Sequence, residues 1–218
     1  MEKKFWAEAW EQGNIGFHQK IIHSYLRRFY RRLGIAEGDS VFVPLCGKSL
    51  DMVWLQQQGA AVVGVELSPL AVQAFFEEND LNAFRDQQEP FESYSSGNLQ
   101  LLCGDLFDLS QEEICHARAV YDRASLVALP KEMRRCYAAK LASLLPSGGR
   151  VLLVSYDYDQ AEMAGPPFAV SAEELVELFE ADFTMELLAE GDVLESHRVL
   201  AERGLTRLSE KAHLLIRK

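Results

Sequence analysis

Two stretches decide the fold class, Val41-Phe42-Val43-Pro44-Leu45-Cys46-Gly47 and Ala61-Val62-Val63-Gly64-Val65-Glu66. Each contains a short, continuous apolar run rich in β-branched residues, which is typical of a strand buried on both faces of a parallel sheet. Pro44 cannot donate a ladder hydrogen bond, so we expect the first strand to end there. Residues 49–58 between the runs have helical apolar spacing and are followed by Gly59, so the three segments predict a strand–helix–strand unit.

The same alternation continues toward the C-terminus. Ser68-Pro69 has the form of a helix start, with Ser as N-cap and Pro at the first helical position. Polar residues 87–98 are expected to form a loop. Further strands are predicted at 99–103, 119–122, 151–155, 183–188 and 213–216, and further helices at 131–145 and 171–179. The pattern predicts an α/β fold with a doubly wound, mostly parallel sheet and helices on both faces.

Length and composition favour a single domain over residues 1–218, with residues 1–34 as an N-terminal extension. Two helices are expected in this extension, at about 5–10 and 20–33, and Gly13 to Gly16 break the chain between them. Aromatic residues flank the breaker, as they would in a mobile lid. The alternative for Phe5, Trp6 and Trp10 is an aromatic stripe that packs the extension onto the core.

Charge and cysteine content exclude several classes of function. The formal net charge of −11 argues against nucleic acid as a general partner, and the basic cluster at Arg27, Arg28, Arg31 and Arg32 is interpreted as a solvated helix face. The four cysteines form no C-x-x-C pair, and the histidines do not join them at ligand spacing, so no metal site is expected. No segment approaches the ~20 apolar residues that span a bilayer. We expect a reduced, cytoplasmic protein without membrane contact.

Candidate binding residues follow the predicted strands, because ligands of open α/β sheets bind beyond the carboxyl ends of the strands. Glu66 lies 19 residues after Gly47, and an acid about 20 residues past the first glycine turn binds a ribose diol in dinucleotide sites. The alternative is a helix-capping or ion-paired Glu. Asp105 follows Gly104 and is a candidate for an adenine amino group or, alternatively, for an Asx turn. The first turn lacks G-x-G-x-x-G, which argues against a pyrophosphate ligand.

Five motifs, in order along the chain, resemble the thiopurine S-methyltransferase family, a family of class I S-adenosylmethionine-dependent methyltransferases with a Rossmann-like fold. The short N-terminus resembles the bacterial branch of that family. The strings P-L-C-G-K and G-P-P-F are the more specific ones. The motifs are Ile15-Gly16-Phe17-His18, Val43 to Ser49, Val63-Gly64-Val65-Glu66, Tyr121-Asp122-Arg123 and Gly165-Pro166-Pro167-Phe168.

The resemblance implies a role for each matched residue. Trp10 would cover the cofactor, Leu45 would contact it and Glu66 would hold its ribose. Asp105 and Leu106 would flank the adenine. Arg123 would lie near cofactor and acceptor, with Asp122 beside it in a positioning role, and Phe17 would line the acceptor pocket. The alternative for Asp122 and Arg123 is a structural ion pair, and His18 is interpreted as a surface or packing residue.

The predicted function is methyl transfer from S-adenosylmethionine to aromatic or heterocyclic thiols, with other chalcogen compounds as further candidate acceptors. We expect a monomeric enzyme with a small-molecule thiol as partner. Such acceptors ionise readily, so no strong general base is expected. The alternatives are a small-molecule methyltransferase with an oxygen or nitrogen acceptor, a nicotinamide-dependent oxidoreductase, and a binding module that keeps the fold without catalysis.

Overall fold

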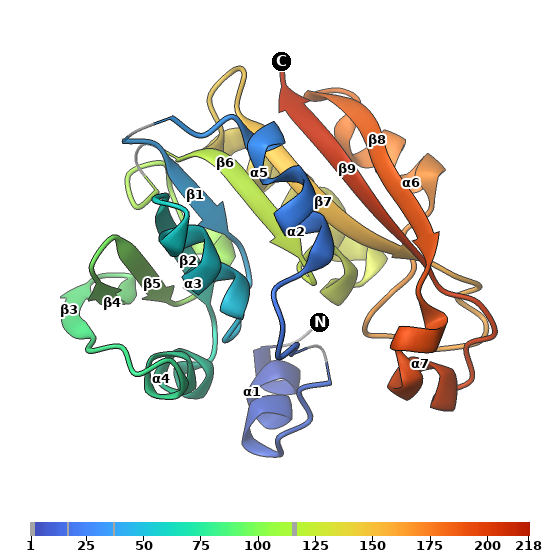
Figure 1. Ribbon diagram of the computed structural model, residues 1–218, viewed down its shortest axis with the longest axis horizontal. Helices are drawn as coiled ribbons and strands as arrows, with labels where there is room; N and C mark the ends of the chain where they lie inside the picture. Colours follow the sequence, from blue (N-terminus) through green and yellow to red (C-terminus); the bar gives the residue numbers. More distant parts are fainter. Residues whose placement is uncertain (1–2, 17, 37, 115–116) are drawn as a thin grey trace. The chain divides into compact units, whose positions relative to one another are not determined.

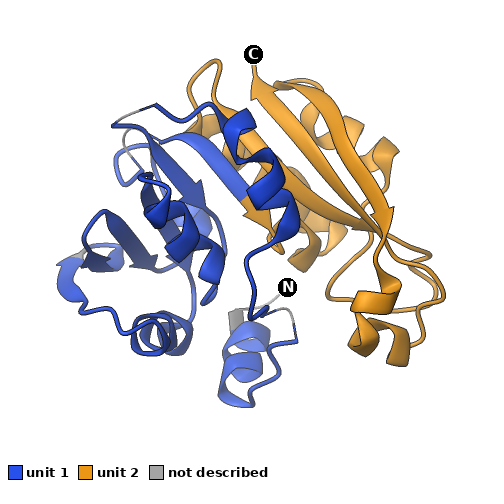
Figure 2. Ribbon diagram, viewed as in Figure 1, with its two compact units in different colours: residues 1–121 blue, residues 122–218 orange. Residues whose placement is uncertain are grey.

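The computed structural model describes residues 3–16, 18–36, 38–114 and 117–218. Two compact units make up the chain, residues 1–121 and residues 122–218 (Figure 2). Strands alternate with helices along the chain (Figure 1), and the central strands of the first unit run parallel, so the predicted α/β fold class is confirmed. Among the residues that the structure describes, no helix is both long enough and apolar enough to cross a membrane.

The sheet of the first unit has the order β3-β4-β5-β2-β1-β6. Its parallel part contains β1 (Ser40–Val43), β2 (Ala61–Glu66), β5 (Leu99–Cys103) and the first residues of β6 (Ala117–Arg123). β1 and β2 lie inside this sheet and are almost wholly buried, which is why their sequences are continuous apolar runs rather than alternating ones. Because these strands are parallel, they end at one edge of the sheet, where Glu66 is the last residue of β2 and Asp105 follows β5.

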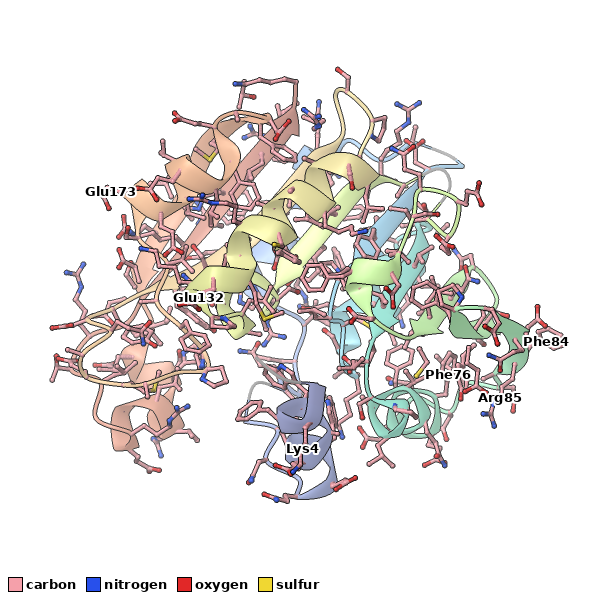
Figure 3. The ribbon with its side chains drawn as sticks, turned by 180° about the vertical axis from the view of Figure 1, so that it is seen from behind. Lys4, Phe76, Phe84, Arg85, Glu132 and Glu173 are labelled. Carbon is pink, nitrogen blue, oxygen red and sulfur yellow. The ribbon has the colours of Figure 1, made fainter. Side chains whose placement is uncertain are left out.

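The expected loop over residues 87–98 is wrong. The segment contains the end of β3 (Phe84–Gln88) and all of β4 (Phe91–Ser96), which pair antiparallel with each other, and β4 pairs with β5. Phe91 and Tyr94 are buried, and Tyr94 stacks on Phe76 with the ring centroids 6.0 Å apart. Figure 3 shows Phe84 and Arg85 at the periphery of this unit, where Phe84 is 71% exposed. Phe91 and Tyr94 lie on opposite faces of β4, and the other residues of the strand are Glu92 and three serines, which gave the segment the composition of a loop.

Serine side chains cap two helices of the first unit, and only the cap at Ser68 was predicted from the sequence. Ser49 accepts a hydrogen bond from the N–H of Asp51 at the start of α3 (Leu50–Gln57), and Ser68 accepts one from Ala71 at the start of α4 (Pro69–Glu78). In the extension, α1 spans Lys3–Glu11. The second expected helix begins later than predicted, as α2 (Ser24–Phe29), and continues as the 3₁₀ turn η1 (Tyr30–Leu33). A second 3₁₀ turn, η2 (Leu106–Asp108), follows β5.

A buried carboxylate attaches α2 to the rest of the first unit. Asp51 of α3 accepts hydrogen bonds from the backbone N–H of His23 at 2.9 Å and from the Tyr121 hydroxyl of β6, also at 2.9 Å. Asp51 is only 2% exposed, so both bonds replace hydration that the carboxylate has lost. The extension is therefore anchored at His23.

The second unit contains an antiparallel group of strands in the order β7-β9-β8, formed by β7 (Arg150–Asp157), β9 (Ser209–Arg217) and β8 (Phe183–Asp192). Both terminal strands are longer than predicted. The helices are α5 (Lys131–Leu144), α6 (Ala172–Phe179) and α7 (Arg198–Glu202), with 3₁₀ turns η3 (Leu126–Ala128) and η4 (Leu194–Ser196). Arg134 of α5 is buried and donates to the Leu129 and Ala169 carbonyls and to Glu174 of α6, which fixes the loop before α6.

Candidate functional site

The turn after β1 has a backbone conformation that few sequences adopt. Leu45 has φ of +43° and Gly47 has φ of +53°, so two residues of this turn lie in the left-handed region. For Leu45 this conformation costs free energy, and such strain persists where the surroundings impose it. The N–H of Cys46 donates to the Val65 carbonyl at 3.0 Å, which holds the turn against β2. The turn therefore presents its backbone beside the end of β2.

Glu66 ends β2 and joins two turns. One carboxylate oxygen, Oε2, accepts from the N–H of Gly47 at 2.9 Å, and Oε1 accepts from the N–H of Ser68 at 2.7 Å. The side chain is 7% exposed. Burial raises the pKa of Glu66 above its ordinary value, while the N–H groups of Ser68 and Gly47 act in the opposite direction. The two carboxylate oxygens can accept about four hydrogen bonds between them, so Glu66 keeps capacity for a further donor.

Trp10 of α1 lies over this turn. A Cβ atom placed on Gly47 would lie 3.4 Å from Cζ2 of the Trp10 ring. A cleft of about 590 Å³ separates α1 from the residues that follow Glu66, with Trp6 on one side and Leu67, Ser68 and Leu70 on the other. The sequence predicted Trp6 only as a packing residue of the aromatic stripe. The i, i+4 spacing of Trp6 and Trp10 is the signal that places both on one face of the helix.

Asp105 and Leu106 follow β5 at the same edge of the sheet. The N–H of Gly104 donates to the Glu66 carbonyl at 2.9 Å, which brings the end of β5 next to the end of β2. Asp105 accepts from the N–H of Phe107 at 2.9 Å, as an Asx turn requires, and Leu106 is buried. The first unit thus brings together Trp10, Leu45, Glu66, Asp105 and Leu106.

An adenosyl ligand fits this donor and acceptor set. A ribose diol needs a carboxylate with acceptor capacity to spare, which Glu66 provides, and a phosphate-free methionine portion needs one open glycine turn rather than a phosphate cradle. The cleft beside Trp6 supplies an aromatic and aliphatic wall.

Asp122 and Arg123 belong to the second unit and end β6. Asp122 is fully buried, and it accepts from the Tyr137 hydroxyl at 2.7 Å and from the N–H of Leu126 at 3.2 Å. Burial raises the pKa of Asp122 to about 6. Ala124, directly after Arg123, has φ of +64°. Asp122 therefore holds the strained turn that follows Arg123. Phe17, the residue implied for the acceptor pocket, lies outside the described residues.

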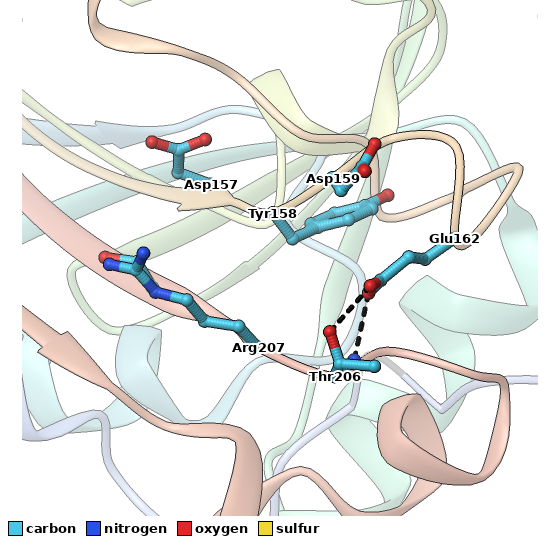
Figure 4. A pocket seen from close by; sticks show the side chains of 7 residues that line it. Asp157, Tyr158, Asp159, Glu162, Thr206 and Arg207 are labelled. Carbon is cyan, nitrogen blue, oxygen red and sulfur yellow. Dashed lines mark hydrogen bonds between the residues drawn. The ribbon is translucent and has the colours of Figure 1, made fainter.

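The second unit also has a polar pocket of about 430 Å³, formed in part by Asp157, Asp159, Glu162 and Arg207 (Figure 4). Its carboxylates have partners within the unit. Glu162 bonds to the Thr206 side chain at 2.6 Å, Asp157 pairs with Lys211 at 2.6 Å, and Asp159 accepts from the N–H of Ala161. None of the residues predicted from the sequence lines it.

The chain has close relatives of one description. A family model described as thiopurine S-methyltransferase matches residues 1–218. A protein of Nitrosospira multiformis with that name is 49% identical and covers 99% of this chain and 98% of its own length. Another of that name, from Azotobacter vinelandii, is 48% identical, with full coverage of both chains.

Solved structures share the fold at low sequence identity. A SAM-dependent methyltransferase from Anabaena variabilis has a TM-score of 0.63 at 15% identity and covers 99% of this chain and 95% of its own. The YcgJ protein of Bacillus subtilis has a TM-score of 0.65 at 12% identity, with 90% and 99% coverage. At such identities the likeness establishes the fold alone.

Proposed function

We propose, because this chain belongs to the thiopurine S-methyltransferase family, that it methylates the sulfur of aromatic or heterocyclic thiols. S-adenosylmethionine is the methyl donor, and when bound it supplies a methyl group activated by a positive sulfur. The observation that carries the proposal from the structure is the end of β2, where Glu66 is buried, doubly hydrogen-bonded and still able to accept.

On the donor side, the proposed task of the chain is to hold and align. Glu66 would bind the ribose hydroxyls, and the turn at Leu45 and Gly47 would pass beside the methionine portion. Trp10 would cover the ligand, in keeping with its place over Gly47. Asp105 and Leu106 would flank the adenine from the end of β5. Displacement at a methyl carbon is sensitive to alignment, so positioning is the main catalytic contribution that these residues can make.

On the acceptor side, we propose that Arg123 and Phe17 bind the thiol. A guanidinium favours the ionised form of a nearby acid, so Arg123 would lower the pKa of the thiol and increase its thiolate fraction. Asp122 would act indirectly, by holding the turn after Arg123 through Tyr137 and Leu126. Replacing Arg123 by Ala should therefore reduce kcat/KM most for the less acidic thiols.

A methylation screen with aromatic thiols, aliphatic thiols, selenols, phenols and amines tests the reaction class. We expect acidic aryl thiols to be the best acceptors, with activity retained in the presence of a chelator. An ionised thiol is nucleophilic without a Lewis acid or a strong base, whereas a phenol needs help to lose its proton. If phenols or amines outpace every thiol, or if chelator abolishes activity, the proposed acceptor is wrong.

We further propose that residues 1–218 act as one methyltransferase domain with residues 1–34 as its lid, and that the protein is a cytoplasmic monomer. The family match over residues 1–218 supports the single domain. The contact of Trp10 with the Gly47 turn supports the lid. Light scattering on the purified protein would test the monomer, and a second mass at twice the chain mass would contradict it.

A further inference from the structure

A polar cluster in the second unit surrounds the hydroxyl of Tyr156. Tyr156 on β7 and Glu210 on β9 are directly opposite each other in the antiparallel register, so their side chains share one face of the sheet. The Tyr156 hydroxyl donates a hydrogen bond to Glu210, whose side chain is 4% exposed. Burial and the Glu210 carboxylate raise the pKa of Tyr156, while the nearby Arg123 guanidinium lowers it. Arg123, Tyr156 and Glu210 are therefore electrostatically coupled.

His197, before α7, contacts the same hydroxyl. Its Nε2 lies 3.2 Å from the Tyr156 oxygen, and the two rings meet edge to face with centroids 5.7 Å apart. Nδ1 lies 2.9 Å from the Val193 carbonyl oxygen, which can only accept. Ser196 Oγ, also near Nδ1, donates its own hydrogen to Val193. Nδ1 must therefore carry a hydrogen, and in the neutral ring Nε2 is then an acceptor.

This arrangement is one hydrogen short when His197 is neutral. The Tyr156 hydroxyl has a single hydrogen, but it faces two acceptors, His197 Nε2 and the Glu210 carboxylate. Adding one proton to Nε2 completes the chain, because Nε2–H then donates to the Tyr156 oxygen while Tyr156 donates to Glu210.

We propose that His197, through Tyr156, takes up the proton that a thiol acceptor loses when it is methylated. The inference rests on the proposed function, because it uses Arg123 as the residue that binds the acceptor. The Tyr156 hydroxyl turns its hydrogen from Glu210 to His197 Nε2 and transfers it there, while the S–H bond breaks and the thiol proton passes to the Tyr156 oxygen. The new hydroxyl hydrogen then donates to Glu210. The sulfur electron pair forms the new S–CH₃ bond while the donor C–S bond breaks, leaving S-adenosylhomocysteine. His197 is partly exposed and returns the proton to solvent.

The groups around this hydroxyl come from two strands, β6 with Arg123 and β9 with Glu210, and from His197 in the segment before α7. Arg123 at the end of β6 would favour the thiolate form of the acceptor, and Glu210 on β9 accepts the hydrogen bond of Tyr156. A thiol that is already ionised needs no proton acceptor. The cluster therefore extends the reaction to thiols that are mostly protonated at the working pH. The methylation rate should depend on His197 for these thiols and not for thiols that are already ionised.

The test compares His197→Gln and Tyr156→Phe with the exposed neighbour variant Glu195→Gln in the full-length enzyme. With a thiol that is mostly protonated at the assay pH, both cluster variants should lose about a hundredfold or more in kcat/KM, the usual scale of acid–base catalysis. With a fully ionised aryl thiol they should stay within about twofold, and Glu195→Gln should match the wild type throughout. Equal losses with both thiols would mean that His197 and Tyr156 only support the structure, and would overturn the inference.

A second readout is independent of turnover. Nitrogen-15 NMR of the complex with S-adenosylhomocysteine should show neutral His197 with its hydrogen on Nδ1. Adding an aryl thiol that is protonated in solution should increase the protonated fraction of His197 at constant pH. A neutral ring with hydrogen on Nε2, or no change on adding the thiol, overturns the inference. An enzyme that prefers phenols or amines would instead overturn the proposed function, while this NMR result still decides whether His197 accepts the proton.

Discussion

Replacing Glu66 by Ala should weaken the binding of S-adenosylhomocysteine more than it weakens the fold. The ribose diol would lose a charged acceptor, and hydrogen bonds to charged groups contribute about 1.5–3 kcal/mol, which is roughly ten- to hundredfold in Kd. In the free protein the substitution also leaves the N–H groups of Gly47 and Ser68 without their side-chain acceptor. This structural loss is partly offset because burial already disfavours the ionised carboxylate, as its raised pKa indicates.

Titration calorimetry measures the affinity, and thermal unfolding of the free variant establishes that it is folded at the assay temperature. Glu92→Ala is the matched control, because it removes the same charge from β4, where Glu92 pairs with Arg85. The control should bind S-adenosylhomocysteine like the wild type. Glu66→Gln should fall between wild type and Ala, since it keeps one acceptor oxygen without the charge. A folded Glu66→Ala protein with wild-type affinity would refute the assignment of the ribose site.

Three further predictions follow from the same geometry. Amide exchange over residues 5–16 should slow when S-adenosylhomocysteine binds, because Trp10 lies over the Gly47 turn, and equal exchange with and without ligand would contradict a lid. Gly47→Ala should lower the free energy of unfolding by about 1 kcal/mol, because φ of +53° is costly for Ala; an unchanged urea midpoint would show that the turn relaxes. The pKa of Asp122, about 6 in the folded chain, exceeds its unfolded value, so its ionisation destabilises the fold as pH rises through 6. Relative to Asp122→Asn, the wild type should therefore gain about 1 kcal/mol of unfolding free energy between pH 7 and pH 5, and a constant difference would mean that Asp122 does not titrate there.

Local sequence signals predicted the elements that local interactions determine. Ser68 and Pro69 start α4 as expected, and Ser171 caps α6 by accepting from the N–H of Glu174. The apolar runs of β1 and β2 are strands because both faces of each are covered. In contrast, β4 depends on partners elsewhere in the chain. A Cβ on Gly104 would overlap the Phe91 ring, so Phe91 is accommodated only because residue 104 is glycine, and no local pattern reveals that pairing.

Some features of the candidate site could likewise be predicted from the sequence, whereas others depend on the fold. The position of Glu66 could be predicted because a strand end and a spacing of 19 residues from Gly47 are both visible in the sequence. The hydrogen bond from Gly47 to Glu66 could not, since it depends on the left-handed turn after β1. His197 was missed altogether. It lies 41 residues from Tyr156 in a segment without strong helical or strand periodicity, and only the β7–β9 register places Glu210 beside the same hydroxyl.

The two hydrogen bonds at Glu66 have a consequence for affinity. A flexible carboxylate loses rotamer freedom when a ligand binds, and this ordering cost subtracts from the binding free energy. In the free protein, Gly47 and Ser68 already hold both oxygens of Glu66 in place. The ordering and desolvation costs of the carboxylate therefore fall on folding rather than on binding. Variants that loosen the Gly47 turn while leaving Glu66 intact should therefore lower cofactor affinity as well as stability. In such variants the Glu66 side chain would be ordered only when the ligand binds, and this cost would reduce the binding free energy.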